Sequence, residues 1–153
     1  MSDLIYIFFI SMVPLIELRG SIVVGAAMGV TWYQCMIVSI IGNMIPVPFI
    51  LFFIRKILDL MKKVKILAPI AEWIERHGSK RSDRVTKYAT FGLLLFVGIP
   101  LPGTGAWTGS LIAALLGIDR KKAMISVFAG ILLASVIMTL AAYGFVGFLG
   151  FLT

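Results

Sequence analysis

The sequence predicts an all-α integral membrane protein with a single domain over residues 1–153, and both composition and pattern support this fold class. Of the 153 residues, 60% are hydrophobic and only 14% are charged, and the mean hydropathy is +1.05. Soluble domains carry about a quarter charged residues. Four apolar segments, at about 4–30, 32–54, 88–118 and 123–150, each exceed the roughly 20 residues that a helix needs to span a bilayer. The net charge of +7 lies mainly between these segments, so it indicates membrane topology and not a nucleic-acid partner.

The first apolar segment is interrupted near its middle by the stretch Pro14-Leu15-Ile16-Glu17-Leu18-Arg19-Gly20-Ser21. Its proline and glycine predict a break in the helix. A charge at bilayer depth costs roughly 3 kcal/mol even on lenient insertion scales, so Glu17 and Arg19 mark a candidate functional site. A cleaved signal peptide is not expected, because the start lacks a basic region and the apolar run continues past a typical signal core.

The other three apolar segments differ in whether they are interrupted. The second and fourth carry no charge, which is typical of spanning helices, and Pro46 and Pro48 are expected to bend the second. The third contains Pro100, Pro102 and Gly103 in close succession, which predicts a turn within the segment. The first and third segments are therefore the broken ones.

Two membrane topologies are compatible with these segments. If all four cross, the basic stretch 55–87 and the basic loop 119–122 lie on opposite sides, which violates the positive-inside rule for one of them. If the first and third segments are re-entrant hairpins, both basic regions are cytoplasmic and both termini lie outside. We predict the hairpin topology. Broken backbone at membrane depth needs protein or a wet cavity around it, so the two hairpin tips should be buried against each other.

The two halves of the chain resemble each other when they are aligned with a shift of 88 residues. Both follow the order of broken hairpin, glycine-aliphatic turn and spanning helix. With the hairpin topology, this predicts two inverted-topology repeats, residues 1–54 and 88–153, as in many secondary transporters with sites near the midplane. The matching pairs are Pro14 and Pro102, Ala26 and Ala114, Gly29 and Gly117, Met36 and Met124, and Gly42 and Gly130.

Residues 55–87 between the repeats predict a cytoplasmic amphipathic linker. Apolar residues recur at steps of three and four from Ile57 to Ile74, and lysine and arginine fill much of the rest. This pattern favours an interfacial helix with a kink at Pro69 and Trp73 at headgroup depth. A polar loop is expected over residues 78–87.

Glu17 and Arg19 have a structural and a functional interpretation. In the first, they neutralise each other as an ion pair that fixes the hairpin tip. In the second, Arg19 binds an anion such as a phosphate, and Glu17 takes a proton or a cationic group. The amides of Gly20 and Ser21 are expected to start the returning half-helix, so that the positive end of its dipole faces the cavity.

The second candidate stretch, residues 102–109, combines glycines with hydroxyl side chains. The structural interpretation is close packing of small residues between helices, and the functional one is contact with an anion or a lipid headgroup. A nucleotide-binding phosphate loop is excluded, because the Gly-Lys-Ser/Thr ending is missing. Trp107 is expected either to pack over a ligand or to line the hairpin. The candidate site residues are Pro102, Gly103, Thr104, Gly105, Trp107 and Thr108.

Asn43 is a polar residue within the second apolar segment. It is expected to hydrogen-bond to a neighbouring helix, or to orient Glu17 or Arg19. The sequence shows no Ser/His/Asp set, metal cluster or pair of carboxylates, and the single Cys35 excludes an intrachain disulfide. Neither an enzyme nor a cofactor is expected.

The motifs Pro-x-x-Glu-x-Arg-Gly-Ser at Pro14 and Pro-x-Pro-Gly-Thr-Gly-Ala-Trp-Thr-Gly at Pro100 resemble those of the small multi-drug export protein family, along nearly the whole chain. That resemblance implies drug efflux. The layout also resembles the DedA family, which has two re-entrant hairpins, each followed by a spanning helix. The DedA likeness implies movement of lipid phosphates coupled to ions, with Glu17 as the acidic residue of the first hairpin. The DedA arginines of the second hairpin have no counterpart in residues 103–109.

The sequence therefore predicts a small plasma-membrane transporter that moves an amphipathic or lipid-phosphate substrate by alternating access. Coupling to protons or another ion is expected through Glu17. Expected partners are membrane lipids and a second copy in a homodimer, because 153 residues give a thin wall around a polar midplane. Two other classes stay open. One is a non-transporting scaffold or assembly factor with a structural ion pair, and the other is an ion channel, although no ring of charges supports a channel.

Overall fold

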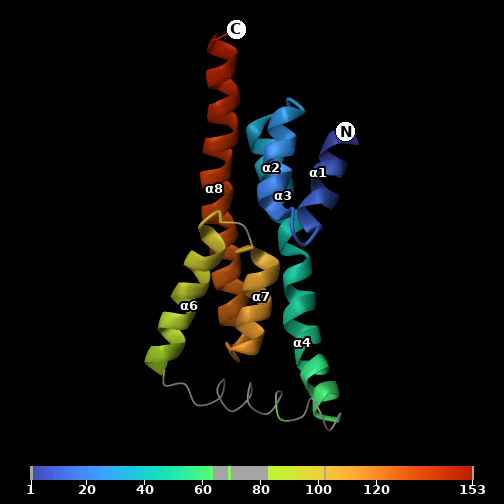
Figure 1. The fold of residues 1–153 in the computed structure, drawn as a ribbon, viewed down its shortest axis with the longest axis vertical. Coiled ribbons are helices and arrows are strands. Elements are labelled where there is room, and N and C mark those ends of the chain that lie inside the picture. The colour runs from blue at the N-terminus through green and yellow to red at the C-terminus, as the bar shows by residue number, and fades with distance from the viewer. Residues whose placement is uncertain (1, 64–68, 70–82, 102, 153) are drawn as a thin grey trace.

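A computed structural model of the chain describes residues 2–63, 69, 83–101 and 103–152 (Figure 1). These residues form helices and turns, and no strand occurs among them. An all-helical fold class is thus confirmed for the described part of the chain. The helices are α1 (Ser2–Met12), α2 (Glu17–Ala27), α3 (Trp32–Met44), α4 (Pro46–Lys63), α6 (Asp83–Gly98), α7 (Ala106–Leu115) and α8 (Arg120–Leu152).

Two pairs of short helices point toward each other from opposite ends of the molecule. Residues 13–16, the first turn, join α1 to α2, and residues 99–105, the second turn, join α6 to α7. In Figure 1, α1 and α2 lie in the upper half and α6 and α7 in the lower half, so the two turns meet near the middle. The breaks predicted at Pro14 and Pro100 are confirmed. Their re-entry into a membrane stays a prediction.

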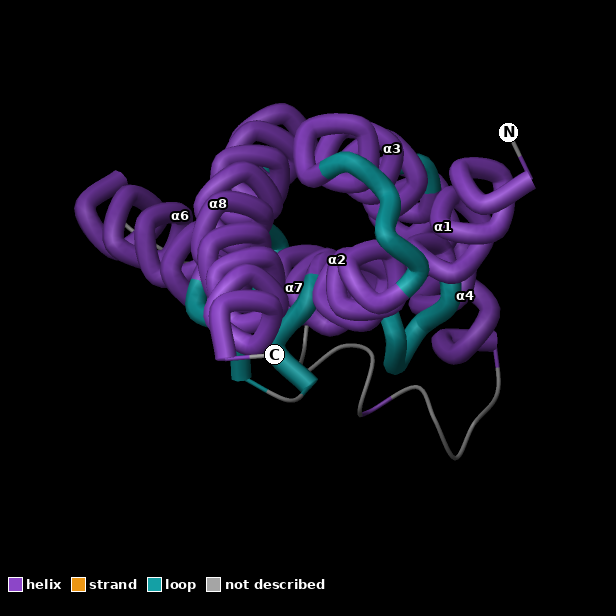
Figure 2. The backbone as a smooth tube through the Cα atoms, turned by 90° about the horizontal axis from the view of Figure 1, so that it is seen from above, coloured by secondary structure: helices purple, strands orange, loops and turns teal. Residues whose placement is uncertain are grey.

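The long apolar helices run alongside these pairs. Residues Trp32–Phe53 and Arg120–Phe148, with 22 and 29 residues, are long and apolar enough to cross a membrane. The first stretch comprises α3 and the start of α4, which meet at Ile45 because Pro46 has no amide hydrogen to continue the helix ladder. Seen from above (Figure 2), α1 and α6 lie at opposite outer edges, with α2, α3, α7 and α8 between them.

Glycine allows the outer helix of each pair to approach its long helix closely. A Cβ atom at Gly42 of α3 would lie 2.6 Å from the carbonyl oxygen of Phe8 in α1. A Cβ atom at Gly130 of α8 would lie 2.8 Å from the carbonyl oxygen of Leu94 in α6. Both distances are below what a real side chain tolerates, so larger residues would separate these helices.

The helices α2 and α7 end in the same local geometry. Gly29 and Gly117 have positive φ angles of 72° and 65°. The amide of Val30 donates to the oxygen of Gly25 at 3.0 Å, and that of Ile118 donates to the oxygen of Ala113 at 2.9 Å. These are Schellman caps, in which glycine adopts the left-handed conformation cheaply. The shift of 88 residues therefore aligns equal backbone structure, while the inverted-topology repeat stays a prediction.

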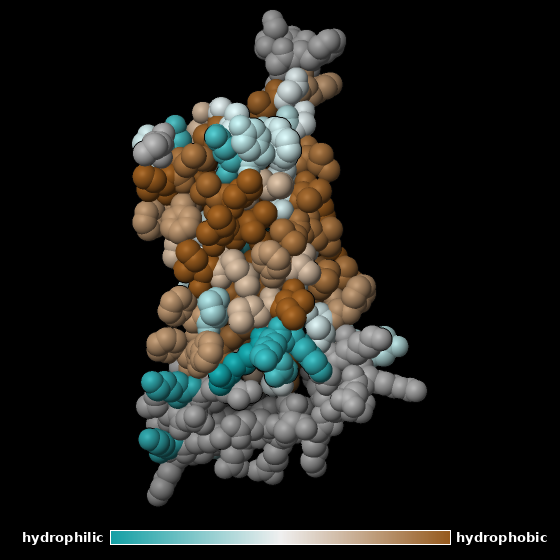
Figure 3. Space-filling view, turned by 180° about the vertical axis from the view of Figure 1, so that it is seen from behind, coloured by the Kyte–Doolittle hydropathy of each residue, from teal (hydrophilic) through white to brown (hydrophobic). Residues whose placement is uncertain are grey.

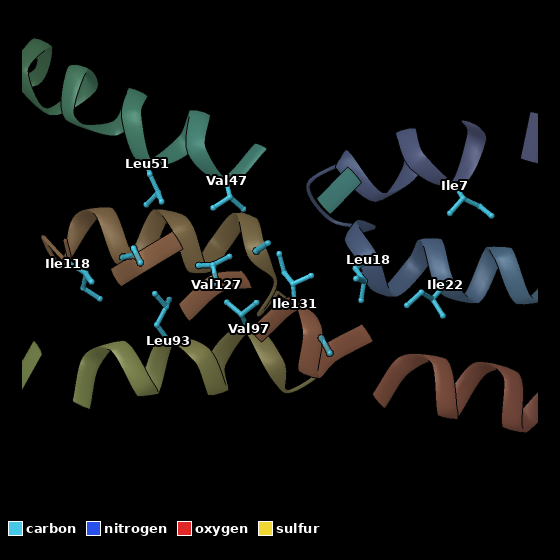
Figure 4. Packing of buried hydrophobic residues seen from close by; sticks show 14 of the residues in the cluster. Ile7, Leu18, Ile22, Val47, Leu51, Leu93, Val97, Ile118, Val127 and Ile131 are labelled. Carbon is cyan, nitrogen blue, oxygen red and sulfur yellow. The ribbon is translucent and has the colours of Figure 1, made fainter. Parts of the chain in front are cut away.

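Buried side chains from both halves form one interior. Leu18 of α2, Val97 of α6 and Ile131 of α8 are each at most 2% exposed. Figure 4 shows Leu18 and Val97 on either side of Ile131, which connects the first helix pair to the second. The core thus runs through both halves and includes buried residues next to the two turns.

Part of the predicted linker 55–87 can be compared with the structure. Residues 55–63 continue α4, whereas residues 64–68 and 70–82, with Trp73, lie outside the described residues. The predicted kink at Pro69 is therefore not tested. The polar loop expected to reach Lys87 is wrong at its end, because α6 begins at Asp83. No proline or glycine between Asp83 and Tyr88 interrupts a helix there.

Candidate binding site between the two turns

The first turn depends on an unusual backbone conformation at Glu17. Glu17 has φ +50°, and among the described residues no other non-glycine residue has a positive φ. Its amide donates to the oxygen of Val13 at 3.0 Å, which closes the turn and starts α2. A non-glycine residue in this region costs conformational energy and is found more often at functional sites than elsewhere.

The prediction that Gly20 and Ser21 start the returning helix is wrong. The helix already begins at Glu17, and the amide of Gly20 donates within it to the oxygen of Ile16 at 2.9 Å. The left-handed residue at this break is Glu17, and Gly20 has an ordinary helical backbone. The amide of Gly20 is therefore used within the helix, and the role of Gly20 and Ser21 in binding stays a prediction.

The Glu17 carboxylate caps the helix of the other half. Glu17 is 7% exposed, and its Oε1 accepts a hydrogen bond from the amide of Trp107 at 3.1 Å. Trp107 lies in the first turn of α7, and Gly105, the residue before α7, has no side chain to serve as a cap. A Cβ atom at Gly105 would overlap Oε2 of Glu17. The carboxylate thus occupies the place of a missing cap at the positive end of the α7 dipole.

The Arg19 guanidinium binds the carbonyl oxygens that follow α6. Its Nη1 donates to the oxygen of Leu101, and its Nη2 lies 3.1 Å from the oxygen of Ile99. Nη2 also lies 2.9 Å from both the carbonyl oxygen and Oγ1 of Thr104. Nη2 lies 3.4 Å from the oxygen of Val97 in the last turn of α6, so the positive charge is placed at the negative end of this helix dipole. The contacts described for Glu17 and Arg19 therefore go to the second turn and to the ends of α6 and α7 beside it, and not to each other.

Other predicted residues strengthen the contact between the turns. The Trp107 indole Nε1 donates to the carbonyl oxygen of Met12, the last residue of α1, at 3.0 Å. Gly103 has φ +80°, which the second turn needs and glycine accepts. Oγ1 of Thr104 lies 2.9 Å from the oxygens of both Ile99 and Leu101, which places its hydroxyl inside the turn. Each of these residues shapes or holds a turn.

A cavity of about 600 Å³ opens beside these contacts. This volume is within the usual range of small-molecule sites. The lining includes apolar residues that sequence reasoning missed, among them Leu15, Leu111 and Met138. Leu111 could have been found, because it lies one helical turn beyond Trp107, whereas nothing in the sequence singles out Met138. The predicted site residues in the lining are Glu17, Arg19, Gly20, Gly103, Trp107 and Thr108.

The remaining predicted residues lie elsewhere. Ser21 is buried away from the cavity, and its hydroxyl lies 2.8 Å from that of Ser39. Asn43 is buried in a separate small space beside Glu17 and Arg19. Pro102 lies outside the described residues. Among the described residues, no three His, Cys, Asp or Glu side chains come together, so no metal site is assigned.

Comparison with known proteins gives the family. The family model described as "Putative small multi-drug export protein" matches residues 17–137. The chain belongs to this family. The match begins at Glu17, so it contains both charged residues that follow the first turn, Glu17 and Arg19, and all of the second turn. Family membership and the two long apolar helices together indicate a membrane protein. Neither a curated protein nor a solved structure gives a match. The DedA-like layout stays a prediction.

Proposed function

We propose that the chain is a membrane transporter that moves an amphipathic substrate across the bilayer, with the cavity between the two turns as its binding site. The observation that carries this proposal is the cavity itself, which combines Glu17 and Arg19 with apolar walls and lies where broken helices from opposite ends meet. Broken helices with exposed backbone groups are a common source of transporter sites. The export named in the family description agrees with this proposal.

In this proposal, α1–α2 and α6–α7 are re-entrant hairpins. Helix α1 has 11 residues, which span about 16 Å at 1.5 Å per residue and reach only half way across a hydrocarbon core of about 30 Å. Figure 3 supports this depth, since apolar side chains cover the middle of that face and hydrophilic ones gather near its lower end. Both termini lie at the opposite, upper end (Figure 1), which the positive-inside rule assigns to the outside of a plasma membrane. The halves then form inverted-topology repeats.

The cavity lining favours an amphipathic molecule over a lipid phosphate. The apolar residues and the Trp107 ring offer a surface for the apolar part of a substrate, and Thr108 and Glu17 offer polar contacts. The guanidinium of Arg19 is already bound by carbonyl oxygens of the second turn. A phosphate could recruit Arg19 only by displacing those oxygens, which would open the contact between the turns.

Glu17 is the proposed coupling residue. Its carboxylate stabilises the N-terminus of α7 across the contact between the turns. Protonation removes the negative charge and weakens this cap, so a proton would favour separation of the two turns. Such a link between a proton and the contact between the halves is what alternating access requires.

A homodimer in a lipid bilayer completes the proposal. Leu15 at the rim of the cavity is 99% exposed, and Leu101 at the same rim is 55% exposed. Exposed apolar groups beside irregular turn backbone call for lipid or protein cover at membrane depth. A second copy supplies such cover without closing the cavity to lipid on its other sides.

Transport by purified protein in liposomes tests the proposal. We expect Glu17→Gln to abolish proton-driven uptake of an amphipathic dye, while Asp3→Asn, a change at an exposed carboxylate in the first turn of α1, leaves uptake intact. Arg19→Ala should also lose uptake. Unchanged uptake in both Glu17→Gln and Arg19→Ala would remove the cavity from the mechanism.

A non-transporting scaffold is the second candidate, and one observation favours it. The described polar contacts of Glu17 and Arg19 all go to the second turn and the adjoining ends of α6 and α7, as expected of residues that only hold the fold. In that case Glu17→Gln should lower the melting temperature, and the wild-type protein should transport neither dyes nor lipids. Transport by the wild type that Glu17→Gln loses without a fall in melting temperature excludes the scaffold.

A further inference from the structure

A second, smaller space adjoins Glu17 and Arg19 and is separate from the large cavity. It is lined by residues of α2, α3, the end of α6, the start of α7 and α8, and Asn43 is the polar side chain that α3 contributes. The centre of a water molecule has about 10 Å³ in which to move there. One internal water needs about this much room.

The side chain of Asn43 indicates what kind of ligand this space binds. The residue is 3% exposed, and its Oδ1 is fully buried without a hydrogen-bond partner. A buried amide oxygen without a donor is unfavourable, so native proteins nearly always satisfy such groups. The residues that share the space with Asn43 include Glu17, whose Oε1 already accepts the bond from Trp107 and whose Oε2 faces Gly105.

We propose that this space is a binding site for one water molecule, which donates to Oδ1 of Asn43 and to the Glu17 carboxylate. The water then has two acceptors for its two hydrogens. Glu17 and Arg19 are the titratable side chains that line either space in the described part of the chain. The positive charge of Arg19 beside the space disfavours a metal ion and favours neutral water.

The water makes Asn43 a positioning residue for Glu17. The water anchors the Glu17 carboxylate from the side of α3, while α7 binds the same carboxylate from the other half through the Trp107 amide. The site itself rests on geometry. The role of the water in coupling rests on the proposed function. In that function Glu17 moves away from α7, and a water bound to Asn43 of α3 would oppose this movement.

X-ray radiolytic labelling of the full chain in nanodiscs tests the site. Hydroxyl radicals formed from a bound water oxidise side chains next to it, even when these are buried. Leu18 and Ile131 line the space and are each 1% exposed. Ile22 and Val127, one turn away on the same helices, are 0% exposed and line no described cavity, so they are matched controls.

We expect labelling of Leu18 and Ile131 well above that of Ile22 and Val127, and loss of this excess in Asn43→Leu, which keeps the size but removes the amide. Labelling of Leu18 equal to that of Ile22, together with labelling of Ile131 equal to that of Val127, would overturn the site. Labelling of the wild type that disappears when sodium replaces choline would also overturn it, because a cation would then occupy the space. If Asn43→Leu does not fold, the comparison of Leu18 and Ile131 with Ile22 and Val127 in the wild type still tests the water site.

Transport separates this inference from the proposed function. If the chain carries no substrate but the labelling excess is present, the water site stands and the proposed function fails. If the chain carries substrate, we expect Asn43→Leu to shift the pH profile of transport, which a purely structural role would leave unchanged. Absence of the labelling excess with normal transport leaves the proposed function in place and removes the water.

Discussion

The two turns differ in composition and meet at one place. The first is followed directly by a carboxylate and a guanidinium in α2, whereas the second carries glycine, threonine and backbone carbonyl oxygens. The structure shows that these are complementary: Glu17 binds the amide end of α7, and Arg19 binds the carbonyl end of α6. Two opposite charges two residues apart thus need not form an ion pair. Here they neutralise the two ends of an interrupted helix on the other side of the molecule.

Removal of Arg19 should break this complementarity most strongly. Arg19→Ala leaves the oxygens of Ile99, Leu101 and Thr104 without their shared donor, so we expect a loss of about 3 kcal/mol in unfolding free energy, since hydrogen bonds to charged groups are among the stronger ones. Arg19→Lys keeps the charge but not the planar fork, and should recover less than half of this loss. Equal stability of both variants and the wild type, measured by thermal melting in detergent, would contradict these contacts.

A substitution at Gly105, in the second turn, should disturb the same contact between the turns. Gly105→Ala places a methyl group where Oε2 of Glu17 lies, so the carboxylate must leave its capping position. We expect destabilisation of about 2 kcal/mol, typical of overpacking. Gly92→Ala in α6 is the matched control, because a Cβ atom there meets nothing within 4 Å and should be neutral or slightly stabilising. A melting temperature that falls equally in both variants would remove the special role of Gly105.

The smallest expected effect concerns Trp107. Trp107→Phe keeps an aromatic ring but loses the bond from Nε1 to the oxygen of Met12, which should cost about 1 kcal/mol. Trp32→Phe is the control, because Trp32 is 54% exposed at the start of α3. Thermal melting of the two variants should differ in this direction. A larger loss for Trp32→Phe would show that the bond to Met12 is not a tie between the turns.

Sequence reasoning located both turns but not the contacts between them. Proline and glycine are local signals, so Pro14 and Pro100 were sufficient to predict where the helices break. Apart from the Thr104 hydroxyl, the partners of Arg19 are backbone carbonyl groups, which every residue has, so no pattern of residue types distinguishes them. The positive φ of Glu17 was equally hidden, because glutamate is not a residue that favours it. Gly20, which does favour it, is helical.

The same limit applies to the candidate site. Six of the predicted residues line the large cavity, since charges and glycines within apolar runs stand out. Ser21 stood out for the same reason but faces Ser39, because one position along a helix turns a side chain by about 100°. Met138 was missed because an apolar residue in an apolar helix carries no signal.

The Schellman caps at Gly29 and Gly117 determine which parts can move together. Each closes a connection of only a few residues between a returning helix and the long helix after it. Neither connection has slack to act as a hinge, so α2 should travel with α3 and α7 with α8 as rigid units. A conformational change in this protein would then slide one unit against the other, and it would have to break the contacts of Glu17 and Arg19 and the bond of 2.7 Å from the Tyr143 hydroxyl in α8 to the oxygen of Val30.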